Sequence, residues 1–221
     1  MSKDLVIFGI GEQAQLAHWF FSHDTEYRAA AFAVDAAFIG APSFCGLPVV
    51  PFETLAESFA PSAYDLFVAV GYSKVNRLRK EKYLAAKSMG YRCPSYISKQ
   101  ATVLNDMRFG ENCFILEDNT IQPFAEIGDN VTLWSGNHIG HHAKIESHCF
   151  ITSHVVVSGG VTVGESCFIG VNATLRDHIR IGERSVLGAG TLILSDTAPG
   201  SVYIGNATKP AELPSEGLRR I

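Results

Sequence analysis

Apolar residues recur at every sixth position through the C-terminal half of the chain. The series comprises Ile97, Val103, Phe109, Ile115, Ile121, Ile127, Leu133, Ile139, Ile145, Ile151, Val157, Val163, Ile169, Leu175, Ile181, Leu187 and Ile193. An α-helix repeats about every 3.6 residues and a strand about every two, so neither explains this period. A sustained period of six predicts a hexapeptide β-helix, in which each hexad makes one short strand and one turn.

Two further positions of the hexad support this prediction. The residue four places after each apolar residue is mostly small or β-branched, and the residue directly after it is often glycine. We expect the apolar and the small residue to point into a triangular prism, and the glycines to let the chain turn each corner. Because three hexads close one coil, the series predicts about five to six coils.

The N-terminal part follows a different rhythm. Strands are expected at 5–8, 29–34 and 64–70, helices after the first strand, at 52–59 and at 75–89, and a break in the chain at Pro48 to Pro51. This alternation predicts a small parallel α/β sheet, a Rossmann-like half, with ligands at the carboxyl ends of its strands. The predicted domains are an α/β domain at 1–92 and a β-helix with a C-terminal tail at 93–221.

A glycine-rich turn follows the first expected strand. Gly9, Gly11 and Ala14 have the spacing of a dinucleotide-binding turn, and Asp35 ends the second strand. Backbone N–H groups at such a turn can bind a phosphate or a ring edge at a helix N-terminus. The domain has room for only half of a two-fold Rossmann sheet, so a nucleotide-containing ligand is favoured over nicotinamide chemistry. A purely structural turn is the alternative.

Six of the eight histidines lie in the repeat region. With eighteen residues in a coil, His141 should stack over Gly159 and His142 over Gly160. His138 directly precedes an inward residue and should point outward. We therefore expect a histidine corner of His138, His141 and His142, where the neighbouring glycines leave room for a ligand. The alternative is a set of solvated corner histidines.

A metal is not expected at this corner. The β-helix carbonic anhydrases bind zinc through three histidines, two of them five residues apart, and no histidine pair of the corner has that spacing.

Composition narrows the classes of partner. The net charge of −4 provides no basic face for nucleic acid and no polybasic stretch for an anionic membrane. No signal peptide or membrane-spanning apolar run is recognised, and the five cysteines are scattered. Three of them, Cys113, Cys149 and Cys167, fall on the inward small position, where cysteine packs as a compact hydrophobe. We expect a cytoplasmic protein that binds neither nucleic acid nor membrane.

The chain resembles, end to end, the NeuD/PglD-type sugar acyltransferases. The resemblance is carried by Gly9-Ile10-Gly11 with Asp35, by Val70-Gly71, by the histidine corner, by the segment from Val157 to Gly164 and by Ile204-Gly205-Asn206. It implies a left-handed β-helix with a small nucleotide-sugar domain. Family members are trimers that transfer acetyl from acetyl-CoA to a sugar. Several act on the 4-amino group of a UDP-, dTDP- or GDP-linked 4-amino-4,6-dideoxy sugar, and others O-acetylate sialic acid.

The resemblance also implies roles for individual residues. His141 falls on the general base and Gly159 on the glycine whose N–H meets the acyl oxygen, with His142 and His138 as further catalytic candidates. The nucleotide and diphosphate would be held by Gly9, Gly11, Asp35, Gly71 and Tyr72. Acetyl-CoA would lie between neighbouring prisms, against Gly159, Gly188, Ala189, Gly205, Asn206 and Lys209. The implied assembly is a homotrimer with active sites between subunits and no metal.

Two positions depart from the family pattern. The family often has an acidic residue beside the base, which orients it, whereas the neighbours of His141 are Gly140 and His142. The family's second histidine falls on Phe150, with His154 as a candidate substitute. Two alternatives to amino-sugar N-acetylation stay open: O-acetylation of sialic acid or a related sugar, and a non-catalytic β-helix binding module.

Overall fold

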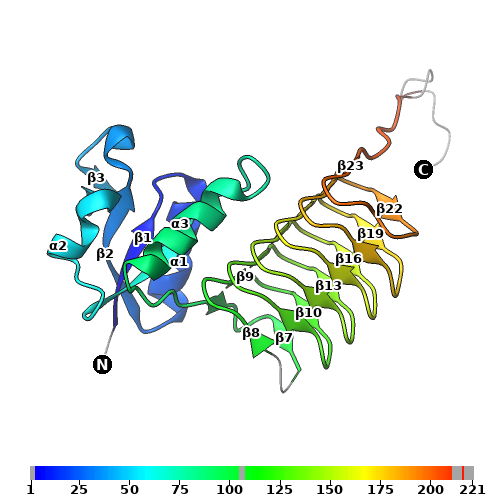
Figure 1. The fold of residues 1–221 in the computed structure, drawn as a ribbon, viewed down its shortest axis with the longest axis horizontal. Helices are drawn as coiled ribbons and strands as arrows, with labels where there is room; N and C mark the ends of the chain where they lie inside the picture. Colours follow the sequence, from blue (N-terminus) through cyan, green and yellow to red (C-terminus); the bar gives the residue numbers. More distant parts are fainter. Residues whose placement is uncertain (1–2, 105–107, 211–215, 217–221) are drawn as a thin grey trace.

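The computed structural model describes residues 3–104, 108–210 and 216 of this 221-residue chain. An N-terminal α/β unit is followed by a stack of short-stranded coils that extends away from it (Figure 1).

The α/β unit is one sheet with a helix on each face (Figure 1). The sheet order is β3-β4-β2-β1-β5, with β1 at Lys3–Phe8, β2 at Tyr27–Val34, β3 at Ser43–Phe44, β4 at Leu47–Pro51 and β5 at Tyr64–Val68. The helices are α1 (Glu12–Asp24), α2 (Leu55–Ser58) and α3 (Arg77–Ser88), with 3-10 turns η1 (Ala36–Phe38) and η2 (Phe52–Thr54). Successive side chains of a strand point to opposite faces. Leu5 and Ile7 therefore pack with α1, whereas Val6 and Phe8 pack with α3.

The segment expected to break the chain belongs to a strand instead. Strand β4 contains Pro48 and Pro51 and pairs in parallel with β2, with Val49 opposite Phe32. Strand β3 adds an antiparallel pairing at the edge, so the sheet is mixed rather than wholly parallel. Both prolines lie near the ends of β4, where a missing N–H costs little. The parallel strands β4-β2-β1-β5 have the order of half a Rossmann sheet, which confirms the predicted fold of this unit.

The coils form three parallel sheets, which we number in the order that the chain visits them after β6. Sheet I comprises β7 (Thr102–Val103), β10 (Thr120–Ile121), β13 (His138–Ile139), β16 (Val156–Val157), β19 (Thr174–Leu175) and β22 (Leu192–Ile193). Sheet II comprises β8 (Arg108–Phe109), β11 (Glu126–Ile127), β14 (Lys144–Ile145), β17 (Thr162–Val163) and β20 (Arg180–Ile181). Sheet III comprises β6 (Tyr96–Ile97), β9 (Phe114–Ile115), β12 (Thr132–Leu133), β15 (Phe150–Ile151), β18 (Phe168–Ile169), β21 (Val186–Leu187) and β23 (Val202–Tyr203).

This arrangement confirms the predicted left-handed β-helix. Each strand from β6 to β22 ends on the apolar residue of its hexad. Residues eighteen apart stack in register, as Thr120, His138 and Val156 do on sheet I. The inward apolar and small residues form one continuous core along the prism. Among the described residues, the structure holds no helix long and apolar enough to cross a membrane.

The glycines that directly follow the apolar residues do not have the expected role in the turns. In the turns that follow the apolar residues from Phe109 to Leu187, the left-handed residue stands three positions after the apolar one, as at Asn130, His142 and His178. Gly140, directly after its apolar residue, does not have a positive φ, so the expectation that such glycines make the turn is wrong. A Cβ at Gly140 would stand 2.6 Å from the nitrogen of Gly159 in the next coil. These glycines are therefore needed for the close approach of successive coils.

The α/β unit is bound to the coils by a fully buried arginine on α3. Arg79 donates to the carbonyl oxygens of Asn130, His148 and Cys149, to the Thr132 hydroxyl and to the Asn76 side-chain oxygen. Burial lowers the pKa of Arg79 to about 10, so the guanidinium stays charged near neutral pH. Five oxygen acceptors compensate for the loss of water around it, which fixes α3 on the coils.

An aromatic contact completes the attachment. Tyr96 and Phe114 on the outer side of sheet III pack with Phe20 and Phe67 of the α/β unit. The chain's own N-terminal unit thus covers sheet III over its strands from β6 to β18, whereas β23 is exposed.

Candidate active site

His141 and His142 meet at the corner between sheets I and II. Their Nδ1 atoms lie 3.1 Å apart, and the two rings are nearly perpendicular, at 85°. Both side chains are exposed. His138 lies on β13, just before this corner, and is partly buried. The predicted histidine corner therefore holds a contacting pair, with His138 on the strand that leads into it.

Gly159 lies directly beside His141, as the eighteen-residue spacing predicts. A Cβ at Gly159 would stand 2.7 Å from both Cε1 and Nε2 of the His141 ring. In the described ranges the Gly159 N–H has no hydrogen-bond acceptor, although the neighbouring N–H groups of Gly160 and His141 are both bonded. A free backbone donor next to an exposed imidazole is what a reaction with a developing oxyanion requires.

Two residues of the preceding coil support the histidine pair. The Gln122 side-chain oxygen accepts the His141 backbone N–H at 2.9 Å. The Phe124 ring packs against the His142 ring, with centroids 4.7 Å apart. Neither residue was identified in the sequence analysis, although both lie about one coil before the histidines and the same spacing points to them.

The glycine-rich turn lines a pocket of about 430 Å³ in the α/β unit. Gly9, Gly11 and Gly71 all line it, together with residues of the turns that precede α1 and α3. Gly9 has a φ of +123°, and a Cβ there would stand 2.6 Å from the Ala69 carbonyl oxygen, so only glycine fits. Gly11 has open space over it. The pocket is thus bounded by the N-terminal ends of two helices, which favours an anionic group.

Two predicted substrate residues are absent from the lining of this pocket. Asp35 forms an ion pair with Lys82 of α3. Tyr72 packs against Phe150 and Phe168 on sheet III, with ring centroids 5.1 and 4.6 Å apart. Asp35 has a cationic partner and Tyr72 bridges the two units, so their roles in substrate binding stay predictions.

The late coils hold a pocket of about 280 Å³, lined in part by Gly205 and Asn206. Gly188 donates its N–H to the Tyr203 carbonyl oxygen, and a Cβ at Gly205 would overlap the carbonyl oxygen of Ala189. The structure thereby brings together Gly188, Ala189, Gly205 and Asn206. Lys209 is exposed in the segment that follows.

The three corners of the prism carry different functional side chains. The corner between sheets I and II carries His141, whereas Ala189 lies at the corner between sheets III and I. His154 lies at that same second corner, with its ring against Gly136 rather than beside His141 of its own chain. Phe150 is buried under Tyr72 on sheet III.

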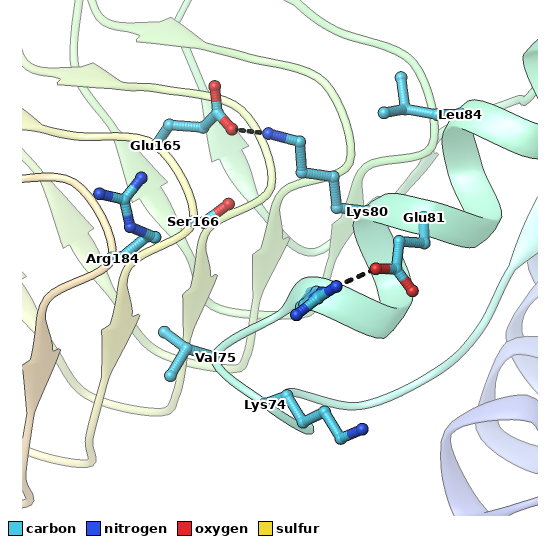
Figure 2. Close-up of a pocket in the computed structure, with 9 residues that line it drawn as sticks. Lys74, Val75, Lys80, Glu81, Leu84, Glu165, Ser166 and Arg184 are labelled. Atoms are coloured by element: carbon cyan, nitrogen blue, oxygen red, sulfur yellow. Dashed lines mark hydrogen bonds and ion pairs between the residues drawn. The ribbon is translucent and has the colours of Figure 1, made fainter. Parts of the chain in front are cut away.

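The third corner, between sheets II and III, faces α3. A pocket of about 420 Å³ lies there, lined by four basic residues, Lys74, Arg77, Lys80 and Arg184 (Figure 2). Lys80 pairs with Glu165 across the gap. Arg77 forms an ion pair with Glu81 of the same helix, and Arg184 forms one with the adjacent Glu183. Because most of its charge is already compensated, we interpret this pocket as part of the attachment between the two units.

Metal ligands do not gather in the described part of the chain: no group of three or more His, Cys, Asp or Glu side chains there is placed to hold an ion. The expectation of metal-free chemistry stays a prediction.

Comparison with known proteins gives consistent matches. A model of bacterial transferase hexapeptide repeats matches residues 125–159 and 160–195. The acetyltransferase domain of PglB from Neisseria gonorrhoeae FA1090 matches with a TM-score of 0.83 at 26% identity, over 95% of this chain and 100% of that one. Perosamine N-acetyltransferase from Caulobacter crescentus also matches, in the structure of a histidine-to-asparagine variant in complex with CoA and GDP-perosamine. The TM-score is 0.82 at 26% identity, over 91% of this chain and 93% of that one.

A third structure, WeeI from Acinetobacter baumannii AYE, is similar in fold, with a TM-score of 0.70 at 15% identity over 92% of this chain and 97% of that one. A comparison with curated proteins found no match. The resemblance stated from the sequence is confirmed: the chain is a hexapeptide-repeat enzyme that is similar, over more than nine-tenths of its length, to acetyl-CoA-dependent sugar N-acetyltransferases.

Proposed function

We propose that the chain transfers acetyl from acetyl-CoA to the 4-amino group of a nucleotide-linked 4-amino-4,6-dideoxy sugar. The observation that carries this proposal is the exposed His141 imidazole beside Gly159, whose N–H has no acceptor among the described residues. His141 Nε2 takes a proton from the amine as its nitrogen attacks the thioester carbonyl, and the Gly159 N–H stabilises the oxyanion. The intermediate then collapses to the amide and releases the CoA thiolate.

Direct transfer, rather than an acyl-cysteine intermediate, fits the positions of the thiols. Cys113, Cys149 and Cys167 are fully buried inside the prism. Burial raises the pKa of Cys113 to about 11 and that of Cys149 well above its ordinary value, which keeps both unreactive as nucleophiles. Ligand complexes of a similar enzyme support this route, since variants of the perosamine enzyme hold CoA and GDP-perosamine together.

The acceptor is assigned to the pocket of the α/β unit. Gly9, Gly11 and Gly71 would receive the diphosphate, because the N-terminal ends of α1 and α3 bound that pocket and α1 has no side-chain cap. Asp35 and Tyr72 would contact the base and the sugar end of the nucleotide. An acyltransferase for a free small sugar would have no need of this unit.

The donor is assigned to the late coils. Gly205 and Asn206 line the pocket there, Gly188 and Ala189 pack directly beside Gly205, and Lys209 would pair with a CoA phosphate. Support comes from the PglB domain, which is also known in complex with acetyl coenzyme A.

We propose a homotrimer with each active site between two subunits, and the faces of the prism support this. Sheet III is covered by the chain's own α/β unit, and the outer positions of sheet II include Glu126, Lys144 and Arg180. Sheet I instead presents threonines, His138, Val156 and Leu192, with the last two exposed. Uncharged, partly apolar faces favour protein–protein contact.

Packing through sheet I would also complete the site. The two edges of sheet I are the corner with His141 and the corner with Ala189. When copies are arranged around a rotation axis with sheet I inward, the His141 corner of one copy lies next to the Ala189 corner of its neighbour. One acetyl-CoA molecule could then contact the late coils of one subunit and His141 of the next. Both cosubstrates are cytoplasmic metabolites, in line with the predicted localisation.

The experiment is a thiol-release assay with acetyl-CoA and a panel of UDP-, dTDP- and GDP-linked 4-amino-4,6-dideoxy sugars, with free sialic acid as the competing acceptor. Turnover on one nucleotide sugar, at least about 100-fold slower in His141→Asn, is the expected result. Turnover on sialic acid alone would assign the enzyme to O-acetylation and remove the acceptor role of the α/β unit. Full ligand binding with no turnover, unchanged in His141→Asn, would indicate a binding module.

A further inference from the structure

The contact between His141 and His142 can hold only one hydrogen. Two Nδ1 atoms 3.1 Å apart form a hydrogen bond when one carries a proton and the other presents a lone pair. We propose that His142 is a positioning residue that accepts the Nδ1–H of His141 and thereby keeps His141 Nε2 unprotonated. This inference rests on the proposed function, in which Nε2 is the base.

Two arrangements of that hydrogen are possible in principle. If His142 donated, the neutral His141 would carry its own proton on Nε2 and could not take one from an amine. If His141 donates, its Nε2 lone pair is free on the side of Gly159. Only that lone pair can take a proton from the amine while the Gly159 N–H stays available to the oxyanion. The proposed function thus requires the second arrangement.

His142 is itself held in place. Its backbone is left-handed, with a φ of 57°, and its ring packs against Phe124. The Gln122 side chain fixes the neighbouring His141 backbone N–H. The preceding coil thus fixes the His141 backbone and the His142 ring, and Phe124, an aromatic side chain that is 68% exposed, gains a role as the support of the His142 ring.

The proton balance of the reaction follows. The attacking amine loses one proton to His141 Nε2, and the imidazolium that forms keeps its Nδ1–H directed at His142. His142 neither gains nor loses a proton. It fixes the tautomer and the ring orientation, which is the role that a carboxylate fills in many histidine bases.

The structure offers a matched set of variants. Glycine removes the acceptor without backbone strain, and the chain itself uses Gly136, Gly160 and Gly190 at the same left-handed hexad position. In His142→Asn the side-chain oxygen replaces Nδ1 at the same number of bonds from Cα, so the acceptor is kept, and asparagine tolerates the left-handed region. His178→Gly is the control, since His178 is left-handed with a φ of 56° and no hydrogen bond of its ring to His141 is found in the described residues.

The test is long-range ¹H–¹⁵N NMR of the full-length protein labelled at histidine nitrogens, with His141 assigned by loss of its signals in His141→Asn. We expect the proton on Nδ1 of His141 in the wild type, in His142→Asn and in His178→Gly, and a shift towards Nε2 in His142→Gly. In the acetyl-transfer assay, kcat of His142→Gly should fall about 10- to 100-fold with little change in KM, and His142→Asn should recover most of it.

The proposal is overturned if His141 of the wild type carries its proton on Nε2, or if His142→Gly leaves the tautomer unchanged. The NMR result does not depend on turnover, so it stands even if the enzyme proves to use another acceptor. Loss of kcat in His142→Gly together with an unchanged tautomer would assign His142 some other role and would also contradict the proposal.

Discussion

Gly159 is the residue at which sequence spacing and structure agree most closely. Its backbone is not in the left-handed region, so glycine is required there for space rather than for conformation. The atoms that a Cβ would meet belong to the His141 ring, a side chain that can move.

We therefore predict that Gly159→Ala lowers kcat about 100-fold while the melting temperature hardly changes. The added methyl group displaces the imidazole and covers the donor N–H, without touching the core. The matched variant is Gly128→Ala, whose Cβ would stand 2.7 Å from the backbone nitrogen of Ser147. That variant should lose stability, and equal losses of stability in the two proteins would contradict this interpretation.

His148 gives a prediction for acid stability. Its side chain is buried, accepts a hydrogen bond from the Asn130 side-chain amide, and has a pKa lowered to about 4, chiefly by burial. The fold favours the neutral ring, so the unfolded chain takes up the proton first as the pH falls. The free energy of unfolding should be constant above about pH 6.5 and decline between pH 6.5 and 4, by on the order of 3 kcal/mol.

Urea unfolding at several pH values measures this decline. His148→Asn is the informative variant, because Asn112 and Asn130 occupy the same left-handed position in the two preceding coils. It should flatten the pH dependence. An equally steep decline in the variant would show that other groups cause it.

Residue contacts across coils were predictable, and contacts between elements of the α/β unit were not. His141 beside Gly159 follows from the period alone, because stacking in register is a property of every β-helix. The ion pair of Asp35 with Lys82 depends on how α3 packs on the sheet, and no local pattern encodes it.

At the scale of elements, the hexad period predicted every strand from β6 to β22, whereas β4 was missed. Proline is a strong local signal against a strand, but the pairing of β4 with β2 outweighs it near the edge of the sheet. The role of the corner glycines was misread for a related reason: the sequence shows where glycine occurs but not whether it serves conformation or close approach.

Helix α3 was predicted, but its attachment through Arg79 was not, because a buried arginine looks in sequence like any other charge on a solvated helix.

Replacing Arg79 tests that attachment. Arg79→Met leaves the buried carbonyl oxygens of Asn130 and His148 without a donor among the described residues, so we predict a loss of about 3 kcal/mol in the free energy of unfolding. Faster hydrogen exchange should appear in α3 and in the turns around Asn130 and His148. Arg77→Met, on the exposed side of the same helix, is the control and should be nearly neutral. Unchanged exchange in α3 of Arg79→Met would show that the aromatic contact alone holds the units together.

At the scale of the whole molecule, the three faces of the prism have three environments. Sheet III is covered by the chain's own α/β unit, sheet II is charged, and sheet I is neither covered nor charged. We predict that Val156→Glu converts the proposed trimer to monomers and abolishes turnover, because it buries a charge in the proposed interface and separates His141 from the late coils of the neighbouring subunit. Thr162→Glu on sheet II should change neither property. Sedimentation measures the assembly, and an active monomeric variant would refute the shared site.

The central claim is that the chain acetylates a nucleotide-linked amino sugar with acetyl-CoA, and that His141 is the general base. Its most direct test is mass spectrometry of the nucleotide sugar after incubation with acetyl-CoA and either the wild type or His141→Asn. We predict that the wild type adds one acetyl group to the 4-amino sugar and that the variant, with the same fold and ligand binding, adds almost none. An unmodified sugar across the whole UDP, dTDP and GDP panel, or acetylation by His141→Asn at the wild-type rate, would contradict the account.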